Sequence, residues 1–183
     1  MRPADWKSKA LSADDVVARV GNGHHVFIHG AAATPTPLLQ ALCRRKELEG
    51  VELYHLHLAG DCPVAAPEHR GRFFSNSLFT GAAFRKPIEE ARADFIPVFL
   101  SDIPRLFKTR RIPLDVAVVQ LSPPDRHSLC TLGPSVDTAL AAAATAGAQT
   151  LSLTSATGLG SGRQYLVNGP DEEGGESVIA ASL

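Results

Sequence analysis

Two short apolar runs, each followed directly by a loop of small residues or prolines, constrain the fold of this chain most. Residues 25–29 (His-Val-Phe-Ile-His) precede Gly30, and residues 116–121 (Val-Ala-Val-Val-Gln-Leu) precede Ser122. An apolar run of this length bounded by turn residues is consistent with a buried strand. In an open α/β sheet, ligands bind at the loops that follow the carboxyl ends of strands. These two loops are therefore the first places to expect a ligand site.

The rest of the chain alternates helical and strand patterns, which predicts an α/β domain with an open, mostly parallel sheet and flanking helices. The expected strands are residues 25–29, 51–58, 95–100 and 116–121, with 150–153 as a further one. The expected helices run from Ser12 to Gly21, from Pro37 to about Lys46, from Gly81 to Ala93 with Pro87 as a break, from Ser101 through Phe107, and from Ser135 to about Ala146. Serine caps predict three of these starts, and an early proline predicts another.

Composition changes at residue 146. Residues 1–146 are expected to form the α/β domain, whereas residues 147–183 are rich in Gly, Ser and Glu and predict a divergent, partly flexible tail. The chain has 183 residues, of which 44% are hydrophobic. That is enough for one domain with a sizeable core.

Charge and cysteine content exclude several classes of protein. A formal net charge of −1 gives no field that would recruit nucleic acid or an anionic membrane. Three cysteines without a Cys-x-x-Cys spacing predict neither a disulfide framework nor a thiolate zinc site, and they fit a reducing cytosol. Residues 1–9 carry no secretory signal, and no apolar stretch has transmembrane length. We expect a cytoplasmic protein, or a mitochondrial one in a eukaryote, without nucleic-acid or membrane partners.

The Gly30 loop can be interpreted in two ways. Gly30 and the three alanines after it leave main-chain N–H groups uncovered by side chains. Together with a helix starting at Pro37, these groups predict an anion site or an oxyanion hole for a thioester carbonyl. A tight strand-to-helix turn explains the same residues without any ligand, and the residues alone leave both interpretations open.

Two further segments carry polar residues near expected strand ends. Asn76 and Ser77 are placed to hydrogen-bond polar groups of a substrate, or to cap a turn. Two prolines follow Ser122 and fix the backbone, which directs Asp125 and His127 across the strand ends. The alternative for this segment is a rigid turn before the last helix.

The histidines match no metal-binding motif. His55 and His57 share one face of a strand by alternation, and His29, Asp61 and Cys62 lie in neighbouring segments. These residue types are metal ligands, but their spacing fixes no geometry. We therefore expect no metal, and we interpret the histidines as hydrogen-bonded structural residues or as lining of a substrate cleft.

Taken in order, residues 25–35, 75–81 and 121–127 resemble the N-terminal domain of the acetyl-CoA hydrolase/transferase family, which includes the 4-hydroxybutyrate and acetate CoA-transferases. The resemblance covers roughly residues 5–146. Family members carry a Gly-x-x-x-Thr-Pro loop near the reacting thioester, and the residues that match it here are Gly30, Ala31, Ala32, Thr34 and Pro35. The resemblance also implies that Asn76, Ser77, Asp125 and His127 line the cleft. Ser128 departs from the family pattern, which has glycine there.

The resemblance implies an enzyme that moves CoA between small carboxylic acids, of the acetate or 4-hydroxybutyrate type, through a glutamyl-CoA intermediate, or that hydrolyses acyl-CoA. Coenzyme A is then a substrate, and no other cofactor is expected. In the family the nucleophilic glutamate belongs to a second, C-terminal domain. Six glutamates are considered for this role, and none of them falls in a matching motif: Glu47, Glu49, Glu52, Glu68, Glu89 and Glu90.

These implications predict a truncated family member that holds no catalytic residue of its own and is inactive alone. Its expected partners are acyl-CoA, small carboxylates and a C-terminal CoA-transferase domain or subunit, with homo-oligomerisation also open. Gly30→Val is expected to impair a reconstituted enzyme while leaving the fold largely intact. Two alternatives stay open: a non-catalytic module that binds CoA-like ligands or only dimerises, and a small metal-dependent hydrolase that uses the histidines.

Overall fold

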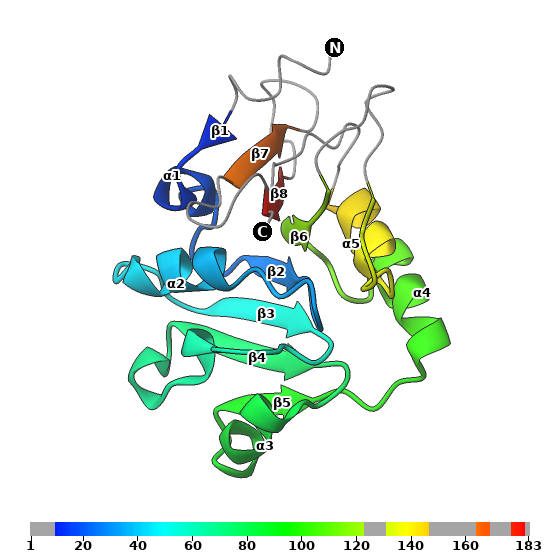
Figure 1. The fold of residues 1–183 in the computed structure, drawn as a ribbon. Coiled ribbons are helices and arrows are strands. Elements are labelled where there is room, and N and C mark those ends of the chain that lie inside the picture. The colour runs from blue at the N-terminus through cyan, green and yellow to red at the C-terminus, as the bar shows by residue number, and fades with distance from the viewer. Residues whose placement is uncertain (1–9, 123–130, 147–163, 169–176, 182–183) are drawn as a thin grey trace.

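The computed structural model describes residues 10–122, 131–146, 164–168 and 177–181, which form one sheet flanked by helices (Figure 1). Within these residues the sheet has eight strands in the order β1-β7-β8-β6-β2-β3-β4-β5. Their bounds are β1 Ala10–Leu11, β2 His25–Ile28, β3 Val51–His55, β4 Phe73–Ser77, β5 Ala93–Phe95, β6 Val116–Gln120, β7 Gln164–Asn168 and β8 Ser177–Ala181. The run β6-β2-β3-β4-β5 is parallel throughout, which confirms the predicted fold class.

Helices cover both faces of the parallel strands. Their bounds are α1 Ala13–Val17, α2 Thr36–Arg44, α3 Ala82–Glu89, α4 Ile103–Lys108 and α5 Ala139–Thr145. On one face, α1, α2 and α3 bury their apolar sides against a cluster that includes Val26, Ile28 and Leu53. On the other face, α4 and α5 pack on a cluster that includes Phe27 and Val119. The alternation of Val26, Phe27 and Ile28 between the two clusters follows the two-residue period of a strand.

The chain crosses the sheet in a way that creates a switch point between β2 and β6. From β2 it steps outward through β3, β4 and β5, and then returns to place β6 on the opposite side of β2. The connection that follows β2 leads to α2 on one face, and the one that follows β6 leads to α5 on the other. A crevice at the carboxyl ends of the strands is the usual result of such a reversal.

Several predicted boundaries shift. The strand expected at 95–100 is β5, Ala93–Phe95, because Pro97 lacks the N–H group that a continuing ladder needs. Serine caps only the first helix, where the Ser12 hydroxyl accepts the N–H of Asp15. The helices expected to start at Ser101 and Ser135 instead have Asp102 and Thr138 at their N-caps, neither of which makes a side-chain capping bond. Pro87 lies inside α3 without ending it.

Four strands were not predicted. β1 lies ahead of the first expected helix, β4 lies between an expected loop and an expected helix, and β7 and β8 lie within the stretch expected to be a tail. The strand expected at 150–153 falls outside the described residues. The sequence Phe-Phe-Ser-Asn-Ser of β4 has turn-forming residues at three of its five positions, which concealed a strand that is buried because it lies between β3 and β5.

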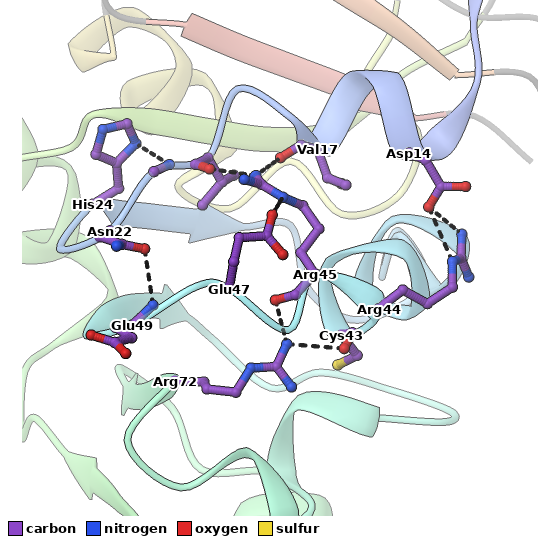
Figure 2. A network of polar contacts seen from close by, with 12 residues as sticks. Asp14, Val17, Asn22, His24, Cys43, Arg44, Arg45, Glu47, Glu49 and Arg72 are labelled. Carbon is purple, nitrogen blue, oxygen red and sulfur yellow. Dashed lines mark hydrogen bonds and ion pairs between the residues drawn. The ribbon is translucent and has the colours of Figure 1, made fainter.

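Near the amino-terminal ends of the parallel strands, two arginines bind main-chain carbonyl groups at the ends of α1 and α2 (Figure 2). The Arg45 guanidinium donates to the carbonyl oxygens of Val17 and Val20 at the end of the α1 segment. Arg72 donates to the carbonyl oxygens of Cys43 and Arg45 at the end of α2, at 3.0 and 2.6 Å. Helix ends leave carbonyls without intrahelical partners, and these guanidinium groups supply the missing donors. The α1 helix ends at Val17, before the predicted stop at Gly21.

Candidate functional site

The Gly30 loop lies at the carboxyl end of β2 and is held against the end of β3. The N–H of Ala31 donates to the carbonyl oxygen of His57 at 2.8 Å, and Ala31 has a positive φ of 50°. A Cβ atom built on Gly30 would lie 2.8 Å from that same carbonyl oxygen. Glycine is therefore required at position 30 for close approach of two backbones. The expectation that Gly30→Val would leave the fold largely intact is wrong for this reason.

The conformation of the loop decides which of its amides can meet a ligand. Ala33 donates to the carbonyl of Gly30 at 3.0 Å, and Thr34 donates to that of Ala31 at 3.2 Å. Together with Ala31, three loop N–H groups are thus already used inside the protein. Among the described residues, the N–H groups of Gly30 and Ala32 make no hydrogen bond, so an oxyanion role falls to these two.

The start of α2 contributes less to an anion site than the sequence predicted. The N–H of Thr36 donates to the carbonyl of Thr34 at 2.9 Å, Pro37 has no N–H, and Leu38 donates to the carbonyl of Pro35 at 2.9 Å. The first turn of the helix therefore directs no unused N–H of these residues at a ligand. Pro35 is the N-cap residue, so the helix begins at Thr36.

The Thr34 side chain holds the Gly30 loop in place through two hydrogen bonds. Its hydroxyl donates to the carbonyl oxygen of Ala31 at 2.8 Å and accepts the N–H of Ala59 at 3.0 Å. The side chain thus joins the loop after β2 to the segment after β3, and only 8% of the residue is exposed. In this structure Thr34 shapes the loop and uses its hydroxyl within the protein.

His29 directly follows β2 and contacts β6 at the switch point. Its Nδ1 accepts the N–H of Gln120 at 3.0 Å, and its Nε2–H donates to the carbonyl oxygen of Ser135. Both ring nitrogens are therefore used, and the residue is completely buried. Burial lowers the pKa of His29, which keeps the ring neutral as this pairing requires. His29 is a structural clamp between β2, β6 and the segment before α5.

His55 and His57 follow each other along β3 and its end, but they differ in their surroundings. His55 is fully buried with its ring 4.4 Å from that of Phe84, and burial lowers its pKa to about 4. His57 is partly exposed, and its ring meets that of Phe79 edge-on at 5.6 Å. Gly81 lies against His57 on the other side, where an added Cβ would come 3.0 Å from the Cβ of His57.

Asn76 and Ser77 both lie in β4, so the interpretation as turn caps is wrong. The Asn76 amide donates to Glu52 Oε2 at 3.1 Å, and the Tyr54 hydroxyl donates to the same oxygen at 2.6 Å. Asn76 therefore belongs to a polar group on the sheet face. Ser77 ends β4 at the carboxyl edge, is completely buried, and has an Oγ without a hydrogen-bond partner.

The loop after β6 is described only at its two ends. The N–H of Ser122 donates to the carbonyl oxygen of Thr131 at 2.8 Å, and the N–H of Thr131 donates to the Ser122 hydroxyl at 2.9 Å. These bonds bring both ends of the loop together beside the end of β6. Asp125 and His127 lie between them, outside the described residues.

The described residues contain no group of three His, Cys, Asp or Glu side chains placed to hold a metal ion. His29 and His55 are separately engaged in the core, and Cys62 Sγ lies 3.7 Å from the carbonyl oxygen of Gly60. In the same part of the chain, no helix is both long and apolar enough to cross a bilayer.

Two contacts of these strands were not predicted from the sequence. His57 is the point where the Gly30 loop and the segment ending at Gly81 meet, and the glycines at 30 and 81 were the available signal. The carboxylate of Glu52 was considered only as a nucleophile, whereas it accepts hydrogen bonds from Tyr54 and Asn76. The alternation of positions 52 and 54 along a strand was the signal for that pairing.

Comparison with known proteins gives one family. Residues 1–155 match the model of the acetyl-CoA hydrolase/transferase N-terminal domain, slightly past the predicted boundary at residue 146. The chain is 43% identical over 143 residues to a succinyl-CoA:acetate/propanoyl-CoA:succinate CoA transferase of Fasciola hepatica, covering 76% of this chain and 30% of that protein. It is 33% identical over 133 residues to the 4-hydroxybutyrate coenzyme A transferase of Clostridium kluyveri, covering 72% and 31%.

Solved structures agree with the sequence relatives. The 4-hydroxybutyrate CoA-transferase of Porphyromonas gingivalis superposes with a TM-score of 0.63 at 26% identity, covering 97% of this chain and 40% of that one. RipA from Yersinia pestis superposes with a TM-score of 0.62 at 26% identity, covering 71% and 33%. The chain therefore spans about a third of the length of the proteins it matches.

Proposed function

This chain belongs to the acetyl-CoA hydrolase/transferase family, and from that premise we propose that it supplies the N-terminal part of an enzyme that transfers CoA between small carboxylic acids. The observation that carries the proposal is the Gly30 loop at the switch point. The residues matching the family loop follow the carboxyl end of β2, the strand at which the sheet order reverses, and a ligand crevice usually forms at such a reversal. The named relatives are CoA transferases acting on acetate, propanoyl-CoA, succinate or 4-hydroxybutyrate.

In this proposal the N–H groups of Gly30 and Ala32 stabilise the oxygen of the acyl-CoA thioester. Negative charge develops on that oxygen when a nucleophile adds to the carbonyl carbon, and preorganised donors lower the energy of that state. Small residues at positions 30–33 allow the thioester to approach the backbone. Asp125 and His127 are proposed to line the same crevice from the loop after β6, and Asn76 and Ser77 to support it from β4.

The nucleophile is proposed to be a glutamate supplied by a C-terminal domain or subunit. Its carboxylate attacks the thioester carbonyl and expels CoA thiolate, which gives an acyl-glutamyl anhydride. The thiolate then attacks the glutamyl carbonyl, so the first acid leaves and a glutamyl-CoA thioester remains. A second carboxylate attacks that thioester, and the reverse steps form the new acyl-CoA. Several easier covalent steps thus replace one difficult exchange.

Three glutamates of the described residues have their carboxylates engaged by other side chains. Glu47 and Glu90 pair with Arg45 and Arg92 at 2.8 and 2.6 Å. Glu52 accepts hydrogen bonds from Tyr54 and Asn76 in the first half of β3. None of these three lies at the carboxyl ends of the strands, where the Gly30 loop follows β2. Their positions support a nucleophile that comes from outside the chain.

The test is CoA transfer from acetyl-CoA to isotopically labelled propionate. The chain is assayed alone, and then mixed with the C-terminal remainder of the Fasciola transferase, which shares 43% identity with it over the aligned region. We expect no transfer by either part alone and measurable transfer by the mixture. A mixture that forms a stable complex without transferring CoA favours the non-catalytic binding module instead.

A further inference from the structure

Three histidines stand at the strand ends, and they differ in how their ring nitrogens are used. Both nitrogens of His29 are hydrogen-bonded, to the N–H of Gln120 and the carbonyl of Ser135. In His55, Nδ1 is bonded to the carbonyl of Leu56 and the ring is completely buried. Within the described part of the chain, the ring of His57 has no hydrogen-bond partner, although its Nδ1 is buried. His57 is thus the histidine of these three whose hydrogen-bonding capacity is unused at an accessible position.

The two nitrogens of His57 face different environments. Nδ1 is buried and has no hydrogen-bond partner among the described residues. Nε2 has no partner there either, but it is not buried. Burying an unpaired N–H group costs more than burying an unpaired acceptor, and such orphaned donors are rare. A proton on Nε2 rather than on Nδ1 leaves no buried donor without a partner, and it places an N–H where an oxygen atom outside the protein can accept it.

The surroundings of His57 limit the size and charge of that partner. An added Cβ on Gly30 would meet the main-chain carbonyl oxygen of His57 and one on Gly81 would meet its Cβ, so both positions leave the residue without a side chain packed against it. The exposed ring of Phe79 forms an apolar wall at 5.6 Å. Among the described residues, no arginine or lysine makes a hydrogen bond or ion pair with His57, whereas phosphate groups are usually held by such cations. A small carboxylate with a short alkyl group fits both the donor and the apolar wall.

We propose that His57 is a substrate-binding residue, whose Nε2–H donates a hydrogen bond to a carboxylate oxygen of the small acid while the acid's alkyl group packs on Phe79. The proposal rests on the CoA-transfer function above, and it names the position that holds the acid. The main chain of His57 also accepts the Ala31 N–H, so the acid is held next to the loop proposed to stabilise the thioester oxygen.

The test uses the 183-residue chain labelled with ¹⁵N and titrated separately with acetate, acetamide and inorganic phosphate. Acetamide matches acetate in shape without its charge, and phosphate represents the charged groups of CoA. We expect acetate to shift the His57 Nε2 resonance in a saturable way, with weaker effects from the other two. A shift of equal or greater size with phosphate, or no response to acetate, would overturn the proposal.

Two variants separate hydrogen bonding from shape. His57→Phe keeps a planar ring and removes the donor, while His57→Gln keeps a donor at a similar reach. Affinity for acetate is read from the amide signals of Gly30 and Ala32. We expect about a tenfold loss in the Phe variant, as for one hydrogen bond to a charged group, and less than about a threefold loss in the Gln variant. Equal affinities in all three proteins would contradict the proposal, and if His57→Phe does not fold, the wild-type ring titration decides.

The outcome is separable from that of the proposed function. If the reconstituted enzyme transfers CoA while acetate leaves His57 unaffected, the function stands and this assignment is wrong. If acetate binds at His57 while the mixture transfers no CoA, the acid site stands without the transfer activity.

Discussion

The main-chain N–H of Ala31 donates to the carbonyl oxygen of His57 at 2.8 Å, and this bond fixes the loop after β2 to the end of β3. It holds only because Gly30 has no side chain to separate the two backbones. The positions proposed to hold the thioester oxygen and the acid therefore meet at one contact. Disturbing that contact should affect both.

Gly30→Ala is expected to destabilise the domain, because the new Cβ would lie 2.8 Å from the His57 carbonyl oxygen. Overpacking of this kind costs about 1–3 kcal/mol. Urea unfolding measures the loss, and hydrogen exchange of the Ala31 amide shows whether the bond to His57 has opened. The control is Gly60→Ala, where an added Cβ meets no atom within 4 Å and only the positive φ is unfavourable. Gly60→Ala should leave Ala31 exchange unchanged; accelerated exchange in both variants would argue against a local contact.

Asn76 and Ser77 are neighbours in β4, but their substitution by alanine should change the stability of the fold differently. Asn76→Ala removes a hydrogen bond to the Glu52 carboxylate and should lower the free energy of unfolding by about 1.5–3 kcal/mol. Ser77→Ala removes a buried hydroxyl that has no partner, so its effect should be close to neutral or stabilising. Denaturant titration of both variants makes the comparison. Equal losses would mean that the Ser77 hydroxyl is satisfied in solution.

Acid should destabilise the fold through His55. Burial lowers its pKa to about 4 in the folded protein, against about 6.5 in the unfolded chain. The unfolded state then binds more protons between these values, so stability is present above pH 6.5 and is lost as pH falls toward 4. The shift corresponds to a loss on the order of 3 kcal/mol. The free energy of unfolding should differ less between pH 7.5 and pH 4.5 in His55→Phe than in the wild type. An unchanged pH dependence in this variant would assign the effect to other groups, such as His29.

Arg72 and Arg44, near the amino-terminal ends of the strands, allow a main-chain capping contact to be compared with a surface ion pair. Arg72→Ala removes donors from the carbonyls of Cys43 and Arg45 and should cost about 2–3 kcal/mol. Arg44 pairs with Asp14 on the surface at 2.7 Å, and both side chains are more than half exposed. Such pairs contribute little, so Arg44→Ala should cost less than about 1 kcal/mol. Similar melting temperatures for the two variants would contradict the capping role of Arg72.

The sequence predicted the sheet better than the site because the two depend on different information. The apolar runs of β2 and β6 indicate burial directly, and the Gly30 loop follows from its position after β2. β4 was missed because Ser75, Asn76 and Ser77 resemble a turn, and only the neighbouring strands make that segment a buried one.

Side-chain partners account for the remaining differences. Nothing in the order of residues shows that Gln120 and Ser135 occupy both nitrogens of His29, since these partners lie 91 and 106 residues away. The same holds for the loop amides, three of which are used by carbonyl groups that only the folded loop brings close. Residue types indicated possible chemistry, and long-range contacts decided which groups are free for it.

The most direct test of the central claim is the intact mass of the reconstituted proteins after incubation with acetyl-CoA. We predict a covalent CoA adduct on the complementing C-terminal part, trapped as the glutamyl thioester, and no adduct on the 183-residue chain. A CoA adduct on this chain would contradict it, because the nucleophile would then be one of the chain's own glutamates.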